Sequence, residues 1–547
     1  LGRHLDSLEI LEAIVARDPK ATAAQTLIGR TAFTLGRYSQ ALSALRAAVK
    51  LDPDDMALRV SVAHAERDAG STLAAVDHVD HVLAREPRNK TAQLLKAQAL
   101  SDLSRHDEAM DMVIDVMNHA SSGDVDTLLV LAEVCGHAQR REEALRAYEL
   151  VLKHRPGDPY VLARLVELKL TLCDWSGYQN FIGELVADVD QRIAAEDILP
   201  IDVHDLQNLP VSYAFLAGAA RCKAAGIARE AEPARARCNF IFDDRLAEWR
   251  TGSGRRKIRL GYALPYTWFH SFPALMKEII ERHDRDQFEV FGYSMMPSKC
   301  REFEVQYRGQ FDKFRDLPLG SPETAARIIH QDEVDIFVDV AGHSSINSQA
   351  VAALRPAPVA AHVLGYAMTS GAEYIDYLIT DPVYMPTEFA AMGTEAVVYM
   401  PETHIAAADP EISDAKVTRE EFGLPEEGFV FCNFNQPFKF GPTMFGYWMS
   451  MLRRVPGSVL WLGNWDASTR TNLRRETEAH GVDTDRLVFS NVIEQDKHLG
   501  RLRLADLALD TYPHGGGATT LEALWVGVPV LTYAGDTPAS LAGDSIL

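Results

Sequence analysis

Cysteine is scarce in this 547-residue chain, and long apolar runs are missing from it. The six cysteines form no close pair and no Cys-x-x-Cys motif, which argues against a disulfide framework and against a zinc cluster. Reduced thiols are typical of the cytoplasm, so we expect a cytoplasmic protein. No apolar stretch reaches the roughly 18 residues that a membrane-spanning helix needs, so we expect no membrane contact.

Basic residues are also in deficit, because 55 lysines and arginines face 77 aspartates and glutamates, a formal charge of −22. A surface this acidic repels nucleic acid, so we expect no nucleic-acid partner. The hydrophobic fraction of 47% excludes a mostly disordered chain. The length predicts three or four domains at roughly 150 residues each. The chain lacks a first methionine and both ends fall within predicted elements, so we expect a fragment.

An internal repeat occupies the first third of the chain. Prolines recur at intervals of 34 residues, at Pro19, Pro53 and Pro87. Small residues at Gly29 and Ala41 would let two antiparallel helices approach closely, while Leu45 and Ala48 would face the next unit. Each proline would end the second helix of its unit, because proline cannot continue a helix. The pattern predicts stacked helical hairpins.

This pattern resembles the tetratricopeptide repeat over residues 1–158, with a degenerate unit at 90–123. Stacked repeats present a concave groove, so we expect it to bind protein or peptide partners. The alternative is an array that only packs against a neighbouring domain or dimerises; the oligomeric state is left open. Residues 159–255 keep a helical pattern without the repeat, and Gly252–Gly254 mark a linker.

From residue 256 onward, short β-branched and aromatic runs alternate with helical stretches. One series of expected strands comprises residues 257–264, 288–294, 335–340 and 359–364. A second series comprises residues 429–434, 458–462, 487–489, 507–510 and 529–533. Such alternation predicts parallel sheets. We therefore expect two Rossmann-like lobes, at 256–400 and 401–547, with ligands at the carboxyl ends of their strands.

The glycine-rich segment after Asp510 is a candidate anion site. A strand ends at Asp510, Gly515–Gly517 follow, and a helix is expected to begin near Thr519. Glycines let backbone amides turn toward a ligand, and a helix N-terminus carries partial positive charge. The hydroxyls of Thr519 and Thr520 would complete a cradle for a diphosphate, and Glu522 could accept hydrogen bonds from a ribose. An ordinary strand–helix turn with a threonine cap is the alternative.

Other candidates are weaker when each is considered alone. Lys439 follows the predicted strand 429–434, where a fixed cation could neutralise a leaving phosphate, although a solvated loop lysine is the commoner case. His270 lies in the loop after the first strand. His498 and Arg501 lie three residues apart on one face of an expected helix.

Together these segments resemble the protein O-GlcNAc transferase family, including its SPINDLY branch. The resemblance spans about residues 165–547, and its segments include CDWSGY, LGYAMTSGAEYIDYLITD, CNFNQPFKF and TTLEALWVGVPVLT. It implies an N-terminal tetratricopeptide α-solenoid followed by a GT-B fold. It also implies an inverting, metal-independent transfer of a sugar from a nucleotide to serine or threonine hydroxyls of proteins. No cofactor is expected beyond the nucleotide-sugar donor.

The matched motifs imply roles on the phosphate side of the donor. Lys439 would be the cation on the diphosphate, and Gln436 would lie near the same phosphates. Thr519 and Thr520 would hold the phosphates, beside the loop glycines Gly516 and Gly517.

The same motifs imply roles at the other parts of the donor. His498 would pack against the base with Arg501 close by, and Glu522 would bind the ribose. His270 would lie at the sugar and acceptor side as a candidate base.

Departures from the family pattern keep alternatives open. A histidine usually precedes the paired threonines of O-GlcNAc transferases, whereas Gly517–Ala518 stand here. That form favours the SPINDLY branch, whose plant members transfer fucose from GDP-fucose, although UDP-GlcNAc is the default donor. Tyr266 replaces a common aspartate and Leu541 a common arginine, which leaves open a repeat scaffold with an inactive transferase module. A transferase acting on glycans or lipids is disfavoured by the repeats.

Overall fold

The structure is a computed structural model that describes residues 2–34, 38–68, 71–119, 124–242, 256–264, 275–295, 305–318, 321–344, 347–366, 368–407 and 410–547. It divides into two compact units. The first comprises Leu1–Val161 with Pro318–Ala325, and the second comprises Leu162–Leu317 with Ala326–Leu547. Within the described residues, no helix is both long and apolar enough to span a bilayer.

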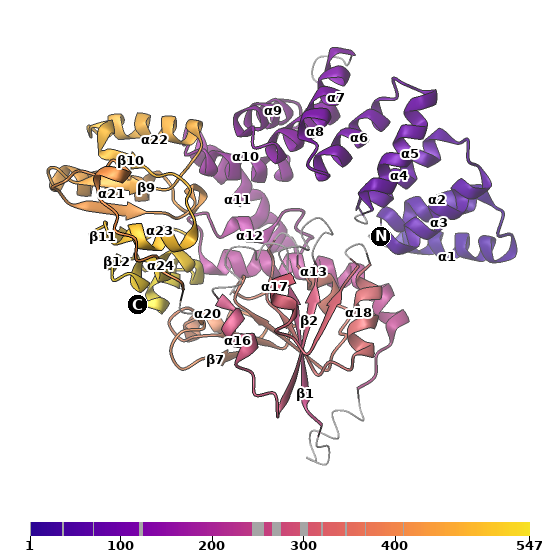
Figure 1. Cartoon of the computed structure of the whole chain (residues 1–547). Helices are drawn as coiled ribbons and strands as arrows, with labels where there is room; N and C mark the ends of the chain where they lie inside the picture. The colour runs from indigo at the N-terminus through magenta and orange to yellow at the C-terminus, as the bar shows by residue number, and fades with distance from the viewer. Residues whose placement is uncertain are drawn as a thin grey trace. The chain divides into compact units, whose positions relative to one another are not determined.

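The first unit is built from antiparallel helix pairs, as the repeat predicts (Figure 1). The helices are α1 (Gly2–Arg17), α2 (Thr22–Thr34), α3 (Tyr38–Leu51), α4 (Met56–Asp68), α5 (Thr72–Arg85), α6 (Lys90–Asp102), α7 (His106–His119), α8 (Val125–His137) and α9 (Arg141–His154). Helix α10 (Pro159–Thr171) begins in this unit and continues into the second. The degenerate unit at 90–123 still forms the pair α6 and α7, because its alanine and leucine positions are kept.

Small residues hold the repeat helices together, which confirms the packing expected from the sequence. A Cβ atom built on Gly29 would lie 2.3 Å from Cγ of Leu45, so α2 and α3 meet where glycine leaves room. Leu45 and Ala48 pack with Leu58 and Val62 of α4 in the next unit. Burial of these apolar faces is what stabilises a stack whose units cannot fold alone.

The helical segment after the repeats belongs to the second unit and contacts both of its lobes. It comprises most of α10, then α11 (Tyr178–Ala195), α12 (Val203–Leu206) and α13 (Tyr213–Cys238). Trp175 packs against the hydrophobic core around Phe445 in the second lobe, and the Asn472 side chain donates to the carbonyl of Leu172 at 2.9 Å. Gly371 of the first lobe approaches the backbone of α13 at Arg221 so closely that a Cβ would clash. The helical segment that follows the repeats is therefore packed into the second unit.

The first lobe contains a seven-stranded parallel sheet in the order β3-β2-β1-β4-β5-β6-β7. Its strands are β1 (Ile258–Leu264), β2 (Phe288–Ser294), β3 (Lys313–Asp316), β4 (Ile336–Asp339), β5 (Val359–Val363), β6 (Tyr377–Thr380) and β7 (Ala396–Tyr399). Its helices include α16 (Lys277–Glu281), α17 (Val305–Arg308), α18 (Pro322–Gln331), α19 (Gln349–Ala352) and α20 (Thr387–Ala390). Four of these strands match the sequence analysis, whereas β3, β6 and β7 were not anticipated.

The second lobe contains a five-stranded parallel sheet in the order β10-β9-β8-β11-β12. Its strands are β8 (Val430–Asn433), β9 (Val459–Leu462), β10 (Leu487–Phe489), β11 (Leu507–Leu509) and β12 (Val530–Leu531). Around them pack α21 (Pro442–Arg454), α22 (Ala467–Ala479), α23 (Gln495–Leu502), α24 (Ala518–Trp525) and α25 (Ala542–Ile546), coloured orange to yellow in Figure 1. All five expected strands are present, so the prediction of two Rossmann-like lobes is confirmed.

Each sheet reverses its strand order at one place, between β1 and β4 in the first lobe and between β8 and β11 in the second. The loops that leave neighbouring strands at such a switch point diverge and open a crevice. In the second lobe these loops carry Lys439, after β8, and the glycine-rich segment, after β11. The side chain of Asn433 ties the two strand ends together by donating to the carbonyl of Leu509 at 2.6 Å.

Candidate functional site

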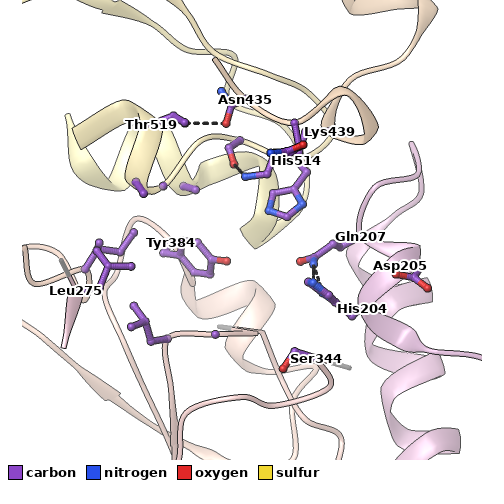
Figure 2. Close-up of a pocket in the computed structure, with 18 of the residues that line it drawn as sticks. His204, Asp205, Gln207, Leu275, Ser344, Tyr384, Asn435, Lys439, His514 and Thr519 are labelled. Carbon is purple, nitrogen blue, oxygen red and sulfur yellow. Dashed lines mark hydrogen bonds between the residues drawn. The ribbon is translucent and has the colours of Figure 1, made fainter. Parts of the chain in front are cut away.

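A cavity of about 640 Å³ lies within the second unit, where the two lobes and the helical segment meet. Its volume is in the range of small-molecule sites. Figure 2 shows its walls: Lys439, His514 and Thr519 come from the second lobe, Ser344 and Tyr384 from the first, and His204 and Gln207 from α12 and its C-terminal end. Of the predicted site residues, Gln436, Lys439, Gly517 and Thr519 line this cavity.

Lys439 is a cation held in a largely dry position. It ends the 3-10 turn Pro437–Lys439, and its ammonium donates to the carbonyl of Gly515 at 3.2 Å. Burial lowers the pKa of Lys439 to about 8, and the carboxylate of Asp510 offsets part of that shift. A charge kept away from water acts strongly on an anion placed beside it. The lysine is therefore suited to an anionic group in the cavity.

The glycine-rich loop wraps around Asp510 before it reaches the cavity. The amides of Thr511 and Gly516 donate to one oxygen of Asp510 at 2.7 and 2.6 Å, and the hydroxyl of Thr532 donates to the other at 2.8 Å. Burial nevertheless raises the pKa of Asp510. The Gly516 amide thus faces the carboxylate and shapes the loop. A Cβ on Gly516 would lie 2.6 Å from Oγ1 of Thr519, which explains why glycine stands there.

Helix α24 directs its N-terminus at the cavity. Gly517 is its N-cap, and Gly517, Ala518 and Thr519 all line the cavity wall. The first amides of a helix lack partners within that helix and carry partial positive charge. Together with Lys439, they give this wall a positive potential suited to phosphate oxygens.

The paired threonines of this helix have different partners. The hydroxyl of Thr519 donates to Oδ1 of Asn435 at 2.7 Å, and both side chains line the cavity. The hydroxyl of Thr520 is buried and donates to the carbonyl of Gly516 at 2.9 Å. Thr520 thus closes the loop onto the helix, and its direct contact with a phosphate stays a prediction.

His498, Arg501 and Glu522 lie together beside the cavity. Arg501 donates to Nδ1 of His498 at 3.1 and 2.9 Å, so Nε2 of His498 carries the proton. That Nε2 lies 3.8 Å from a carboxylate oxygen of Glu522. Burial and the Arg501 charge lower the pKa of His498 to about 4, so the ring is neutral. Phe434 joins this cluster to the cavity, since it lines the wall and its ring centre lies 4.9 Å from that of His498.

Aromatic rings surround the guanidinium of Arg501. It lies 5.5 Å from the ring centre of Phe434, 5.6 Å from that of Phe422 and 5.7 Å from that of Trp461. Burial lowers the pKa of Arg501 to about 10, which leaves it charged at neutral pH. Cation–π contacts of this kind hold a side chain in a fixed orientation. Arg501 therefore holds the His498 ring through Nδ1, the nitrogen opposite the one nearest Glu522. Glu522 is fixed from its other side by Gln495, whose amide donates to it at 2.6 Å.

Two predicted residues, Gln436 and His270, differ in whether the structure describes them. Gln436 lines the cavity with an exposed side chain, one residue before the turn that carries Lys439. His270 lies outside the described residues, as does Tyr266.

The helical segment supplies a wall that sequence analysis missed. His204 and Gln207 contact each other at 2.7 Å, and Nδ1 of His514 lies 2.8 Å from Oδ1 of Asn208. Burial and the Lys439 charge lower the pKa of His514 well below its usual value, so His514 is neutral. The chain separation of 306 residues between His514 and Asn208 explains why no local pattern announced this contact.

The first lobe contributes hydroxyl and imidazole groups. Ser344 lines the cavity, is buried, and its hydroxyl has no hydrogen-bond partner among the described residues. His343 is buried beside it, with Nε2 2.7 Å from the carbonyl of Ser370, and burial lowers its pKa to about 4. Tyr384 and His404 complete this side. These residues follow β4, β6 and β7, at the carboxyl edge of the first sheet.

Among the described residues, no group of three or more histidine, cysteine, aspartate or glutamate side chains is placed to hold a metal ion. Metal-independent chemistry stays a prediction for this chain.

Comparison with protein families assigns the second unit. The model of the glycosyl transferase family 41 matches residues 172–413 and 404–547, which is more than half of the chain. The chain belongs to glycosyl transferase family 41. Models of the tetratricopeptide repeat and of the Psidin N-terminal TPR repeats region match residues 1–55 and 59–181. The resemblance to O-GlcNAc transferases and the repeat-plus-GT-B architecture are thereby confirmed.

Curated relatives carry names of one kind. The Arabidopsis thaliana "Probable UDP-N-acetylglucosamine--peptide N-acetylglucosaminyltransferase SEC" is 31% identical over 54% of this chain and 31% of its own length. A Caenorhabditis elegans UDP-N-acetylglucosamine--peptide N-acetylglucosaminyltransferase is 25% identical over 69% of this chain and 42% of its own. A SPINDLY protein of Arabidopsis thaliana is 29% identical over 53% of this chain and 32% of its own. The chain thus spans well under half the length of these relatives.

Among solved structures, a mutant O-GlcNAc transferase from Thermobaculum terrenum aligns over 100% of this chain and 82% of its own, with 22% identity and a TM-score of 0.49. A tetratricopeptide repeat protein from Thermus thermophilus aligns over 32% of this chain and 91% of its own, with 20% identity and a TM-score of 0.28.

Proposed function

We propose that this family 41 chain is an inverting glycosyltransferase that moves a sugar from a nucleoside diphosphate to serine or threonine hydroxyls of proteins. The observation that carries the proposal is the positive wall of the cavity. There Lys439 and the N-terminus of α24 meet at the switch point of the second sheet. Such a wall stabilises the negative charge that develops on a departing diphosphate.

The donor's parts find matching surfaces in this arrangement. The diphosphate would lie against Lys439 and the start of α24, with Thr519 and Gln436 beside it. The base would lie toward His498, whose neutral ring is held by Arg501. The ribose would face Glu522. The sugar would then face the first lobe, where the hydroxyl of Ser344, which has no hydrogen-bond partner among the described residues, can bind a sugar hydroxyl.

The chemistry follows from this placement. The acceptor oxygen attacks the anomeric carbon from the face opposite the diphosphate, the bond to the phosphate oxygen breaks, and the configuration inverts. The leaving diphosphate takes the electron pair, and Lys439 neutralises its charge. A fixed cation in a half-buried position can supply this stabilisation without a metal, which supports metal independence.

UDP-GlcNAc is the donor we propose first, because the relatives' names refer to it. GDP-fucose is the second candidate, favoured by the glycines and alanine, Gly515–Ala518, that stand before the paired threonines. Acceptor proteins would be recruited by the repeat array, whose helix pairs form a stack of the kind that binds polypeptides.

Calorimetric titration of the chain with UDP, GDP, UDP-GlcNAc and GDP-fucose tests this proposal. Selective binding of UDP and UDP-GlcNAc supports an O-GlcNAc transferase, and selective binding of GDP and GDP-fucose moves the chain to a fucosyltransferase. A Lys439→Ala variant is the matched control, because binding at the proposed site must weaken when the cation is removed. Absence of binding by all four compounds contradicts the proposal and favours a repeat scaffold with an inactive transferase module.

A further inference from the structure

A carboxylate holds a histidine at the cavity wall of the first lobe. Nδ1 of His404 lies 2.6 Å from Oδ2 of Asp381, and the backbone amide of His404 donates to the same oxygen at 3.1 Å. The hydroxyl of Ser545 donates to it at 2.7 Å. The amides of Val383 and Tyr384 donate to the other oxygen at 3.0 and 2.8 Å. Asp381 is therefore fully occupied and fixed.

This arrangement sets the proton on the ring. The hydrogen bonds from His404, Ser545 and the backbone lower the pKa of Asp381 well below its usual value, against the effect of burial, so the carboxylate is ionised. An ionised carboxylate accepts a hydrogen bond, so Nδ1 of His404 carries the proton. Nε2 then has a lone pair, and it has no hydrogen-bond partner among the described residues. A histidine oriented in this way is a proton acceptor of the kind used in acyl-transfer enzymes.

The ring lies on the first-lobe side of the cavity, where the proposed function places the sugar and the acceptor. His404, Tyr384 and Ser344 all line the cavity, and the ring centres of Tyr384 and His404 lie 4.5 Å apart. Figure 2 shows Tyr384 and Ser344 on the first-lobe side, and Lys439 and Thr519 on the second-lobe side. The anion-binding groups thus lie on one side of the cavity and the imidazole of His404 on the other.

We propose that His404 is the general base that removes the proton from the acceptor hydroxyl, and that Asp381 is its positioning residue. This inference rests on the proposed transferase function. In the step, the acceptor O–H bond breaks and its proton passes to Nε2 of His404, while the oxygen forms a bond to the anomeric carbon. The bond from that carbon to the phosphate oxygen breaks, and its electron pair leaves with the nucleoside diphosphate.

Two substitutions remove the basic nitrogen of His404 and keep a polar side chain at that position. His404→Asn keeps an amide that can donate to Asp381 but removes Nε2, and His404→Gln reaches toward the cavity without a basic nitrogen. We expect each to lower the transfer rate about 10²- to 10⁴-fold, the range for loss of a general base. UDP affinity should stay unchanged, because His404 belongs to the first lobe, whereas Lys439 and α24 belong to the second. His480→Gln is the control, a histidine at the end of α22 whose ring contacts the carbonyl of Glu476.

The acceptor provides a readout that a structural role would not change. Transfer from UDP-GlcNAc or GDP-fucose is measured with a pool of end-blocked peptides that contain one serine, and with the matched pool that contains one cysteine. A thiol is far more acidic than a hydroxyl and needs less help from a base. We expect the His404 variants to lose at least tenfold less activity with cysteine than with serine.

The outcomes separate this inference from the proposed function. If the wild-type chain transfers the sugar and both His404 variants do so at near-normal rates, the base assignment alone is overturned. Equal losses with serine and cysteine also overturn it, because they indicate a positioning or folding defect. If the wild-type chain releases no nucleoside diphosphate from either donor, both proposals fail.

Discussion

The two lobes place different chemistry at equivalent edges of their sheets. The carboxyl edge of the second lobe presents a half-buried lysine, a carboxylate and a helix N-terminus, at Lys439, Asp510 and Gly517. The carboxyl edge of the first lobe presents hydroxyls and an imidazole that lines the same cavity, at Ser344, Tyr384 and His404. One topology thus yields a wall with a fixed cation and a wall of hydroxyls and an imidazole.

In the proposed function, the two lobes divide the reaction between them. Stabilising a leaving diphosphate requires fixed positive charge, which is costly to bury and needs a partner such as Asp510. Binding a sugar and deprotonating an acceptor require neutral donors and acceptors. A strong positive field on that side would disfavour proton transfer to a histidine. Separation of the two requirements onto two lobes avoids this conflict.

Removal of the charge on the second lobe should have the largest effect. Lys439→Ala should lower the transfer rate about 10²- to 10³-fold, because it removes the cation that faces the departing diphosphate. Steady-state release of UDP or GDP measures this effect. The fold should survive, since the side chain lies at a cavity wall, and circular dichroism melting checks it. Near-normal turnover would show that the charged wall does not act on the leaving group.

The pH dependence of donor binding should follow Lys439. Its pKa is lowered to about 8, so raising the pH through 8 removes the ammonium charge from the free protein. An anion binds the charged form, and its affinity should therefore fall about tenfold per pH unit above that value. Calorimetric titration with UDP or GDP between pH 7 and 9.5 measures the slope. Lys439→Arg should flatten the profile, because arginine stays charged over this range.

Loss of the His498 ring should weaken nucleotide binding without changing the contacts of the sugar. His498→Ala should lower UDP or GDP affinity severalfold to about tenfold, as expected for the loss of one stacking contact. The affinities for the donor and for the free nucleoside diphosphate should fall by the same factor. Unchanged affinity, measured by calorimetry, would remove the base-packing role from His498.

The first-lobe wall should respond in the opposite way. Ser344→Ala should leave the affinity for UDP or GDP unchanged and weaken the sugar nucleotide about two- to tenfold, the size of one neutral hydrogen bond. The comparison of the two affinities in one titration series isolates the sugar contact. A loss of nucleoside diphosphate affinity would mean that Ser344 belongs to the phosphate wall.

Chelation should have the smallest effect. Addition of EDTA should leave the transfer rate unchanged, because Lys439 and the start of α24 are proposed to stabilise the diphosphate in place of a metal. Rates measured with EDTA, with Mg²⁺ and with Mn²⁺ test this. A strict requirement for either ion would show that the charged wall is incomplete without it.

Local patterns were enough to predict much of the fold. The 34-residue interval of the repeats and the apolar strands predicted helix pairs and two parallel sheets. The strands that were missed include β3 and β7, which form the edges of the first sheet and have largely exposed side chains. An edge strand with few buried side chains has a weak apolar pattern in its sequence. It forms because a neighbouring strand in the sheet is available to pair with it.

Part of the candidate site could be predicted because its residues follow strand ends. Lys439, Gly517 and Thr519 come directly after β8 and β11, so their meeting follows from the parallel topology. The sequence by itself thus determined the repeat, the two lobes and the positive wall. The tertiary structure alone decided that Gly516 turns its amide to Asp510, that Asn208 meets His514, and that Asp381 orients His404. These contacts join segments that are distant in the chain or turned by loop geometry, and only packing brings such groups together.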